Sequence, residues 1–322
     1  MTVHVLDENA QTDEAFGCAP DDRSLEQRLA SGFILLDKPA GPTSHQLAAW
    51  ARDLLGLERL GHGGTLDPFA TGVLPLMAGR CMKITNKILK HKKTYIAVLR
   101  FKSMPDEATL EATIASLTGR IYNVPPEVSA VKVQVRTRSI HAFELLDVEG
   151  NDALTRIVCD AGTYIRTMAR DMGLLLNTPV ELKELRRETS GMFTLDHCVT
   201  MDQLADAVWH WKECGDEGAL KAMVHPIEKL FAKAPRCQIK DSAVAAVAYG
   251  APLLRPGLVT LPVGLKKGKE LLVTSLKGEA VGYVKLKADA DEIATMSDGE
   301  IARPSMVLMD TEVYPRRWSS GA

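Results

Sequence analysis

Fourteen residues, from Gly61 to Leu74, restrict what this chain can do more than any other stretch of its sequence. Three glycines within four positions let the backbone adopt positive φ angles and approach a partner closely, and a single carboxylate follows at Asp67. Asp67 and Pro68 also have the pattern of a helix start, with Asp67 as N-cap, Pro68 as first helical residue and a mostly apolar run over 69–77. The residues alone favour neither this helix start nor a catalytic acid. The two interpretations are compatible, because a helix N-terminus stabilises the ionised carboxylate that a nucleophile or base requires.

The composition places the chain among ordinary globular proteins. Its 322 residues predict two domains, with 46% apolar and 25% charged residues. No stretch reaches 18 uninterrupted apolar residues and the N-terminus is acidic, so we expect no membrane span and no secretory signal, and a cytoplasmic location. Six scattered cysteines, without a C-x-x-C pair or zinc-type spacing, predict buried free thiols rather than disulfides or a metal site.

The charges of the chain are segregated, although the formal net charge is only -2. Residues 1–27 hold seven acids and one arginine, whereas residues 80–102 hold eight Lys/Arg side chains and no acid. Such a local basic surface is typical of a nucleic-acid contact. The alternative is a solvated helix face, on which Lys83, Lys87 and Lys90 recur at helical spacing.

The residue pattern predicts strands and helices after an irregular N-terminus. Residues 1–30 are polar and acidic without periodicity, so we expect a tail or appended segment, disordered over at least its first dozen residues. Residues 32–39 predict a short buried strand, and Ser44 is expected to cap a helix that ends near residue 55. Another strand is predicted from Tyr95, and residues 157–166 predict a strand, a turn and the start of a helix to about residue 176.

The second half of the chain predicts a helical link followed by a small β-rich domain. Arg166 and Arg170 lie one turn apart on their predicted helix and share a face, and we expect Arg170 to pair with a surface acid. Residues 201–232 predict mainly helical structure. Beyond them, a small helix within the run 237–247 and a β-rich region indicate a compact barrel. Its turns are expected at Gly264, Gly268, Gly278 and Gly282.

Five motifs together resemble the TruB/dyskerin family of pseudouridine synthases. They are D-K-P-x-G-x-[ST]-S from Asp37, G-H-G-G-T-L-D-P-x-x-T-G-V-L-P from Gly61, K-x-Y at Lys93, G-T-Y-I-R from Gly162 and L-R-R-x-x-S-G-x-F from Leu185. The resemblance implies an α+β fold, in which a catalytic domain has a central mixed, mainly antiparallel sheet flanked by helices. A small β-barrel-like PUA domain follows it. We expect a TruB-like catalytic domain over 32–232, a PUA RNA-binding domain over 233–316, and an N-terminal tail or segment packing on the C-terminal domain over 1–31.

The resemblance also implies which side chains perform the chemistry. Asp67 matches the catalytic aspartate, Tyr95 matches the tyrosine that stacks on the target base, and Arg166 matches the arginine that pairs with the catalytic carboxylate. Physically, the guanidinium counters the tendency of a carboxylate in a closed apolar pocket to protonate. His62 is expected to occupy the space that the flipped base leaves, although a core histidine would show the same pattern. Leu185 is expected to pack near the pocket, although a plain core leucine would also fit.

Further substrate contacts are expected from residues beside these motifs. Lys93 and Tyr164 lie within the motifs that supply Tyr95 and Arg166. The segment from Pro125 to Lys132 resembles the family's thumb loop, which closes over RNA, and it leads into Arg136 on a β-like stretch. Two positions where relatives commonly carry basic residues hold valine here, Val128 and Val133, so this loop is expected to grip phosphate more weakly.

The resemblance implies an archaeal dyskerin-type enzyme that works inside an H/ACA ribonucleoprotein with a guide RNA. Its substrates would be ribosomal RNA and, as a further possibility, transfer RNA. Its expected partners are a small zinc-binding protein, a β-barrel protein and a kink-turn-binding protein. No cofactor or metal is expected, because the rearrangement is redox-neutral and the sequence holds no P-loop or G-x-G-x-x-G. Two alternatives remain open: a stand-alone, guide-independent synthase acting on the TΨC arm of transfer RNA, and a non-catalytic scaffold.

Overall fold

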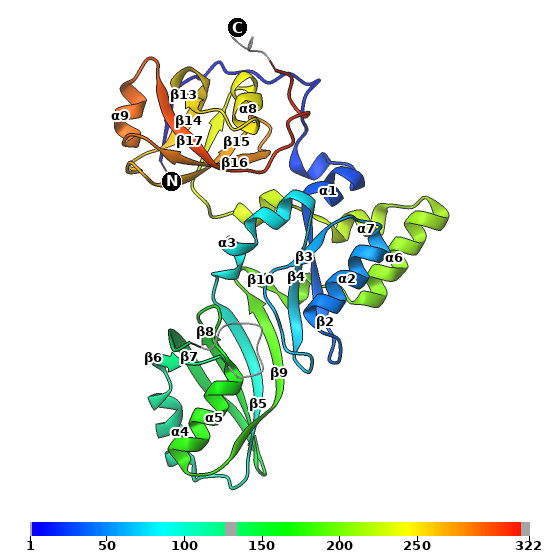
Figure 1. Cartoon of the computed structure of the whole chain (residues 1–322), viewed down its shortest axis with the longest axis vertical. Helices are drawn as coiled ribbons and strands as arrows, with labels where there is room; N and C mark the ends of the chain where they lie inside the picture. The colour runs from blue at the N-terminus through cyan, green and yellow to red at the C-terminus, as the bar shows by residue number, and fades with distance from the viewer. Residues whose placement is uncertain (1, 126–133, 317–322) are drawn as a thin grey trace. The chain divides into compact units, whose positions relative to one another are not determined.

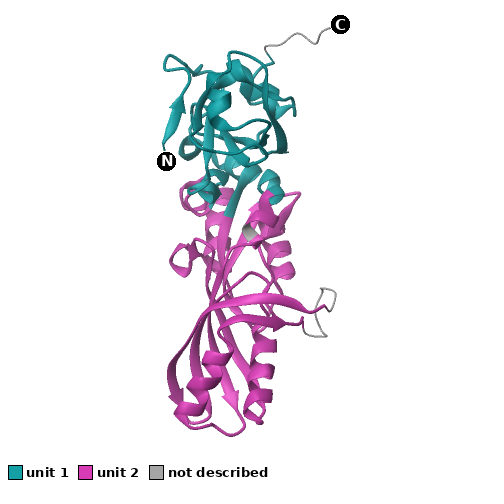
Figure 2. Ribbon diagram, turned by 90° about the vertical axis from the view of Figure 1, so that its left-hand side faces the viewer, with its two compact units in different colours: residues 1–33, 78–83, 224–322 teal, residues 34–77, 84–223 magenta. Residues whose placement is uncertain are grey.

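The computed structural model describes residues 2–125 and 134–316, and Figure 1 labels its helices and strands. The chain divides into two compact units: unit 2 comprises residues 34–77 and 84–223, and unit 1 comprises residues 1–33, 78–83 and 224–322 (Figure 2). Each unit has its own cluster of buried apolar side chains. In the described part of the chain, no helix combines the length and the apolar character needed to cross a membrane.

A mixed sheet with the strand order β2-β4-β9-β5-β8-β7-β6 runs through unit 2. Strands β4 and β9 are parallel, whereas β5 pairs antiparallel with β9 and β8, and β7 pairs antiparallel with β8 and β6. The strands are β2 (Gly32–Lys38), β4 (Thr71–Ala78), β5 (Lys93–Phe101), β6 (Gly119–Asn123), β7 (Arg136–Glu149), β8 (Asp152–Cys159) and β9 (Val180–Ser190). Two short strands extend it, β3 (Leu60–His62) beside β4 and β10 (Phe193–Thr194) beside β9. The predicted mixed, mainly antiparallel sheet is confirmed.

Helices pack on this sheet and close its core. They are α2 (Ser44–Leu55), α3 (Thr85–Leu89), α4 (Glu107–Ser116), α5 (Ile165–Leu176), α6 (Met201–Cys214) and α7 (Gly218–Met223). Alternate side chains of β5 are buried, as the two-residue period of a strand requires, and they cluster with Met168 and Met172 of α5. The predicted helix from about 165 to 176 is confirmed, and Arg170 bonds Asp171 through its guanidinium as expected.

Two details of the predicted elements are wrong. The helix over 44–55 is present, but its N-cap is Thr43 rather than Ser44, because Thr43 and Gln46 form the reciprocal capping bonds. Asp67-Pro68 does not start a helix: the chain after it forms β4, a strand buried between β2 and β9. A run buried on both faces is apolar throughout, so its sequence cannot distinguish it from a buried helix.

Unit 1 contains a seven-stranded sheet with the order β1-β14-β12-β15-β16-β17-β13. The strands are β1 (Val3–Val5), β12 (Arg236–Ile239), β13 (Leu253–Leu254), β14 (Leu258–Pro262), β15 (Glu270–Thr274), β16 (Ala280–Leu286) and β17 (Glu300–Val307), and β11 (His225–Pro226) pairs with the first residues of β2. The helices are α1 (Leu25–Ser31), α8 (Asp241–Ala248) and α9 (Ala290–Thr295). The expected turn at Gly282 is wrong, because this residue lies inside β16, where a Cβ would come within 2.3 Å of the Met306 carbonyl oxygen.

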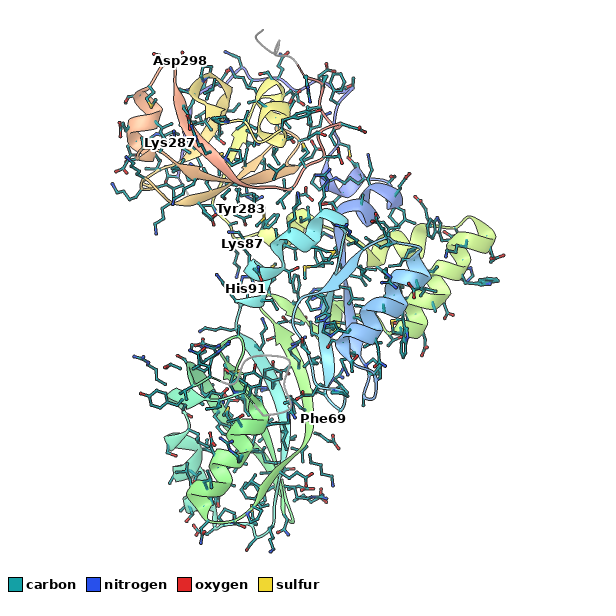
Figure 3. The ribbon with its side chains drawn as sticks, in the orientation of Figure 1. Phe69, Lys87, His91, Tyr283, Lys287 and Asp298 are labelled. Atoms are coloured by element: carbon teal, nitrogen blue, oxygen red, sulfur yellow. The ribbon has the colours of Figure 1, made fainter. Side chains whose placement is uncertain are left out.

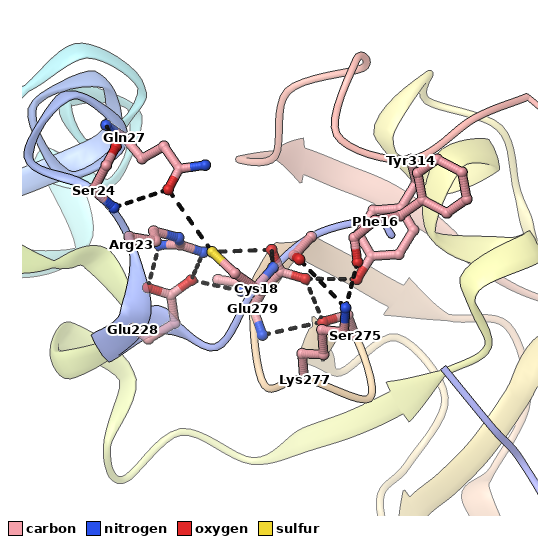
Figure 4. A network of polar contacts seen from close by, with 12 residues as sticks. Phe16, Cys18, Arg23, Ser24, Gln27, Glu228, Ser275, Lys277, Glu279 and Tyr314 are labelled. Carbon is pink, nitrogen blue, oxygen red and sulfur yellow. Dashed lines mark hydrogen bonds and ion pairs between the residues drawn. The ribbon is translucent and has the colours of Figure 1, made fainter. Parts of the chain in front are cut away.

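The N-terminal segment is structured within unit 1, so the expected disorder of its first dozen residues is wrong. Strand β1 pairs antiparallel with β14, and the backbone N–H of Asp13 donates to the Asp241 carboxylate at 2.8 Å. Further along, Arg23 donates two hydrogen bonds to Glu228, at 2.8 and 2.9 Å, within the network of Figure 4. These partners lie more than 200 residues away in the chain, so local sequence could not reveal them.

All six cysteines are free thiols, as predicted. Three of them are buried: Cys81, Cys159 and Cys237. The expectation of burial is wrong for the others, since Cys18 and Cys198 are partly exposed and Cys214 is exposed.

Candidate active site

The loop that carries Asp67 is fixed by hydrogen bonds to its backbone. The hydroxyl of Ser44, which is fully buried in α2, accepts from the Leu66 N–H at 2.9 Å and lies 3.3 Å from the Leu66 carbonyl oxygen. The N–H of Gly63 donates to the Pro75 carbonyl on β4 at 2.7 Å. Two residues that precede the acid, Gly63 and Leu66, are thereby tied to two different elements. Phe69, labelled in Figure 3, is 37% exposed on the same loop.

A buried lysine holds the other end of this loop. The Lys38 ammonium, at the end of β2, donates to the carbonyls of Pro39, Pro68 and Ala70 at 2.8, 2.9 and 2.8 Å. The side chain is 0% exposed, and burial lowers its pKa, while the charge of Asp67 acts in the opposite direction. Three carbonyl acceptors compensate much of the cost of burying this cation.

Asp67 faces an arginine from the first turn of α5. The Arg166 Nη2 donates to Oδ1 of Asp67 at 2.7 Å, and the two side chains are 37% and 31% exposed. This charge-assisted hydrogen bond holds the carboxylate in place, and both side chains remain partly exposed. The structure therefore brings together two of the predicted catalytic residues, which lie 99 positions apart.

Tyr95, the third predicted catalytic residue, belongs to β5 and is 8% exposed. Burial raises the pKa of its hydroxyl; the charge of the Arg187 guanidinium opposes this increase, and the charge of Asp67 adds to it. Tyr95 is therefore neutral at physiological pH and offers an uncharged aromatic ring.

His62 and Leu185 are two further residues predicted to line the pocket. His62 stacks edge-to-face on His45 with ring centroids 4.6 Å apart, and its buried Nδ1 has no hydrogen-bond partner in the described structure. Burial, with smaller contributions from His45 and Arg187, lowers the His62 pKa to about 4, so the ring is neutral at pH 7. Leu185 of β9 is 7% exposed and belongs to the same buried cluster as Tyr95.

Four further residues are predicted to contact the substrate. The Lys93 ammonium is buried and donates to the carbonyls of Leu89 and His91 at 3.3 and 2.7 Å. Tyr164 is partly exposed at the N-cap of α5. Arg136 is partly exposed at the first residue of β7. Lys132, and with it the segment 126–133, lies outside the described residues.

Sequence reasoning missed the buried cations that support the site. Lys38 lies in the motif from Asp37 and Arg187 lies in the motif from Leu185, and they are 0% and 1% exposed. For Lys38 the available signal was a lysine at the end of a mostly apolar strand, which indicates a buried, bonded cation. Strand β9 around Arg187 is rich in charged residues and carries no such signal. Across the described residues, no cluster of three or more His, Cys, Asp or Glu side chains could hold a metal ion.

Comparison with protein families gives four matching segments along the chain. Residues 52–107 match the N-terminal domain of TruB family pseudouridylate synthase, and residues 166–232 match the tRNA pseudouridylate synthase B C-terminal domain. Residues 3–48 match the DKCLD (NUC011) domain, and residues 235–308 match the PUA domain.

Whole-chain relatives carry matching names. A "Probable tRNA pseudouridine synthase B" of Methanothermobacter thermautotrophicus is 40% identical over 309 residues, which cover 96% of this chain and 95% of the relative. The protein of the same name from Pyrococcus abyssi is 40% identical over 317 residues, with coverage of 98% and 95%.

Solved structures agree with these relatives over nearly the entire chain. A chain from an H/ACA RNP bound to a substrate RNA containing 2′-deoxyuridine has a TM-score of 0.87 at 36% identity, with 98% of this chain and 97% of that chain covered. A chain from the archaeal box H/ACA sRNP Nop10-Cbf5 complex has a TM-score of 0.86 at 37% identity, with 98% of each chain covered. The motifs, the fold and the relatives agree: the chain belongs to the TruB family of RNA pseudouridine synthases.

Proposed function

We propose that Asp67, Arg166 and Tyr95 form the site at which this pseudouridine synthase isomerises uridine in RNA. The observation that carries the proposal is the 2.7 Å hydrogen bond from Arg166 to Asp67, on a loop fixed at both ends and within electrostatic range of Tyr95. Asp67 supplies the carboxylate, Arg166 holds it in place by a charge-assisted hydrogen bond, and Tyr95 supplies the aromatic surface against uracil.

The reaction rearranges the bonds of uridine in three steps. The bond from ribose C1′ to N1 breaks, the uracil turns, and C5 bonds to C1′. C5 loses its proton and N1 gains one, so atoms and electrons balance without a co-reactant. Asp67 assists the breaking of the glycosidic bond as an ionised carboxylate. The base must first leave its stack, at a cost of about a few kcal/mol, and stacking on Tyr95 returns about 1–3 kcal/mol.

The predicted substrate contacts complete this proposal. His62, neutral at pH 7, fills the space that the flipped base leaves, and Leu185 packs against the pocket. Arg136 and Tyr164 contact RNA beside the site, together with Lys132. Lys93 acts by fixing the turn before Tyr95, since its ammonium bonds two carbonyls of that turn.

We further propose that the chain works as the catalytic subunit of an H/ACA ribonucleoprotein and takes its target from a guide RNA. The support is that similar solved chains come from complexes with Nop10, with Gar1 and with substrate RNA. A kink-turn-binding protein is proposed as a further partner. Functionally, the chain would divide into an N-terminal segment over 1–31, a catalytic domain over 32–232 and a PUA domain over 233–316.

A second candidate is guide-independent modification of transfer RNA, which the names of the curated relatives favour. Pseudouridine formation in a transfer RNA transcript and in a guided ribosomal RNA fragment separates the two. The test compares the chain alone with the chain plus guide RNA and the two named partner proteins. Turnover of the fragment that requires the guide supports the ribonucleoprotein proposal. Efficient turnover of the transcript by the chain alone, without guided activity, would replace it with the second candidate.

A further inference from the structure

A buried arginine of unit 2 bridges the elements that carry the proposed site residues. Arg187 of β9 is 1% exposed. Its Nε donates to the Val73 carbonyl of β4 at 2.7 Å, and its Nη2 donates to the Gly64 carbonyl at 3.1 Å, three residues before Asp67. One planar group therefore joins the acid-bearing loop and a neighbouring strand.

Glycines provide the close approach that this bridge requires. Gly64 has φ +115°, and a Cβ built there would lie 3.5 Å from Nη1 of Arg187. Gly72, just before Val73, has φ +104°, and a Cβ there would come within 2.2 Å of the Arg187 carbonyl oxygen. A side chain at Gly72 would push β4 away from β9. The hydrogen bond from Arg187 to the Val73 carbonyl would then lengthen.

The charge of Arg187 is expensive to bury and would be unnecessary for packing alone. Its two hydrogen bonds end on neutral carbonyls, and its charge contributes to the lowered pKa of Lys38, Lys93 and His62. An apolar side chain of similar volume would avoid this desolvation and this repulsion. The planar guanidinium can donate to a loop and to a strand at once, which explains why an arginine is placed here.

We propose that Arg187 is a positioning residue for uridine isomerisation, which fixes the Asp67 loop against β4 and β9. The inference rests on the proposed role of Asp67. Arg187 acts through the carbonyls of Gly64 and Val73 and does not itself touch the substrate. Displacement of a reacting group by about 1 Å can lower a rate by about 100-fold, so the loss of this bridge should affect the chemical step.

The test compares R187K with the matched control R186K in the full chain. Arg186 is the neighbouring residue of β9, and its guanidinium bonds Asp37 at 2.7 Å instead of the site. Single-turnover pseudouridine formation is measured in the assembly and on the RNA with which the wild-type chain is active, beside RNA affinity and thermal unfolding. We expect R187K to lower the single-turnover rate by about 10- to 100-fold with RNA affinity within about threefold, and R186K to change the rate by less than about threefold. A folded R187K variant with a normal rate overturns the inference.

Hydrogen exchange distinguishes positioning of this loop from a general structural role. The bridge predicts faster exchange of residues 61–74 in R187K than in the wild type, with exchange in R186K unchanged. Unchanged exchange of these residues in a folded R187K, or equally faster exchange throughout unit 2, overturns the inference. If R187K does not fold, R187Q is measured in the same way and judged by the same outcomes. A D67N variant is measured in parallel. Full activity of D67N would refute the proposed catalytic role of Asp67, whereas an inactive D67N beside a folded R187K with a normal rate would refute only the inference about Arg187.

Discussion

Replacing Lys38 with methionine tests how strongly the active-site loop depends on one buried cation. The variant removes the ammonium that donates to Pro39, Pro68 and Ala70 and leaves three carbonyls in a site where Lys38 is 0% exposed. A hydrogen bond to a charged group contributes about 1.5–3 kcal/mol, so three of them give a gross loss of roughly 5–9 kcal/mol. Relief of the charge burial that lowers the Lys38 pKa offsets part of this loss. We expect a net destabilisation of about 3–5 kcal/mol.

The activity of this variant should fall further than its stability implies. Two of the three carbonyls, those of Pro68 and Ala70, lie within three residues of Asp67, so the freed loop displaces the acid. We expect K38M to lower the single-turnover rate by about 100-fold under conditions where the protein remains folded. Urea unfolding and single-turnover pseudouridine formation measure the two effects.

The matched control for this variant is Lys212→Met. Lys212 is an exposed lysine of the same unit, and its ammonium donates to one carbonyl, that of Leu54, at 2.8 Å. Its replacement should cost less than about 0.5 kcal/mol, because an exposed bond is replaced by water. If K38M loses less than about 1 kcal/mol and keeps its rate, the reasoning from buried hydrogen bonds to loop position is refuted.

Three further predictions concern pH, packing and salt. Burial, with the charge of Arg187, lowers the pKa of Lys93 to about 8, so between about pH 8 and 10.5 the unfolded chain binds more protons than the folded chain. The free energy of unfolding of the wild type, minus that of K93M, should therefore rise with pH across this window, by up to about 3 kcal/mol in urea unfolding. A difference that stays constant with pH would contradict the lowered pKa of Lys93. Gly72→Ala should cost about 3 kcal/mol or more, because its Cβ overlaps the β9 backbone, whereas Gly119→Ala, at φ +98° with open space around it, should cost about 1 kcal/mol; equal losses in thermal unfolding would count against the overlap. RNA affinity should fall steeply as salt increases from about 50 to 200 mM, and a flat response in a binding titration would remove the argument from the basic segment 80–102.

The sequence predicted local elements well where the residue pattern and the fold impose the same structure. The strand from Tyr95 alternates buried and partly exposed side chains as a half-covered sheet requires, and α5 follows its turn as expected. The contact between Asp67 and Arg166 was predicted through the family resemblance, because residue spacing alone could not join positions 99 apart.

The errors and omissions arise where distant contacts override local signals. Asp67-Pro68 has the residues of a helix start, yet the chain beyond it pairs with two strands and is buried on both faces. The N-terminal segment lacks periodicity, but it is held in place by distant residues. The backbone N–H of Asp13 donates to the carboxylate of Asp241, which lies 228 positions away in the chain. The bridging role of Arg187 depends on two carbonyl partners, one in a loop and one in β4, that lie more than 100 residues away in the chain, so no local pattern could show it.

The most direct test of the proposed site is single-turnover pseudouridine formation by the Asp67→Asn variant, with RNA affinity measured on the same preparation. Asparagine keeps the shape of the side chain and can still accept a hydrogen bond from Arg166, but it carries no negative charge. We predict no pseudouridine above the uncatalysed background, with RNA affinity within about threefold of the wild type because the basic surface is unchanged. A rate close to that of the wild type would contradict the assignment of Asp67 as the residue on which the reaction depends.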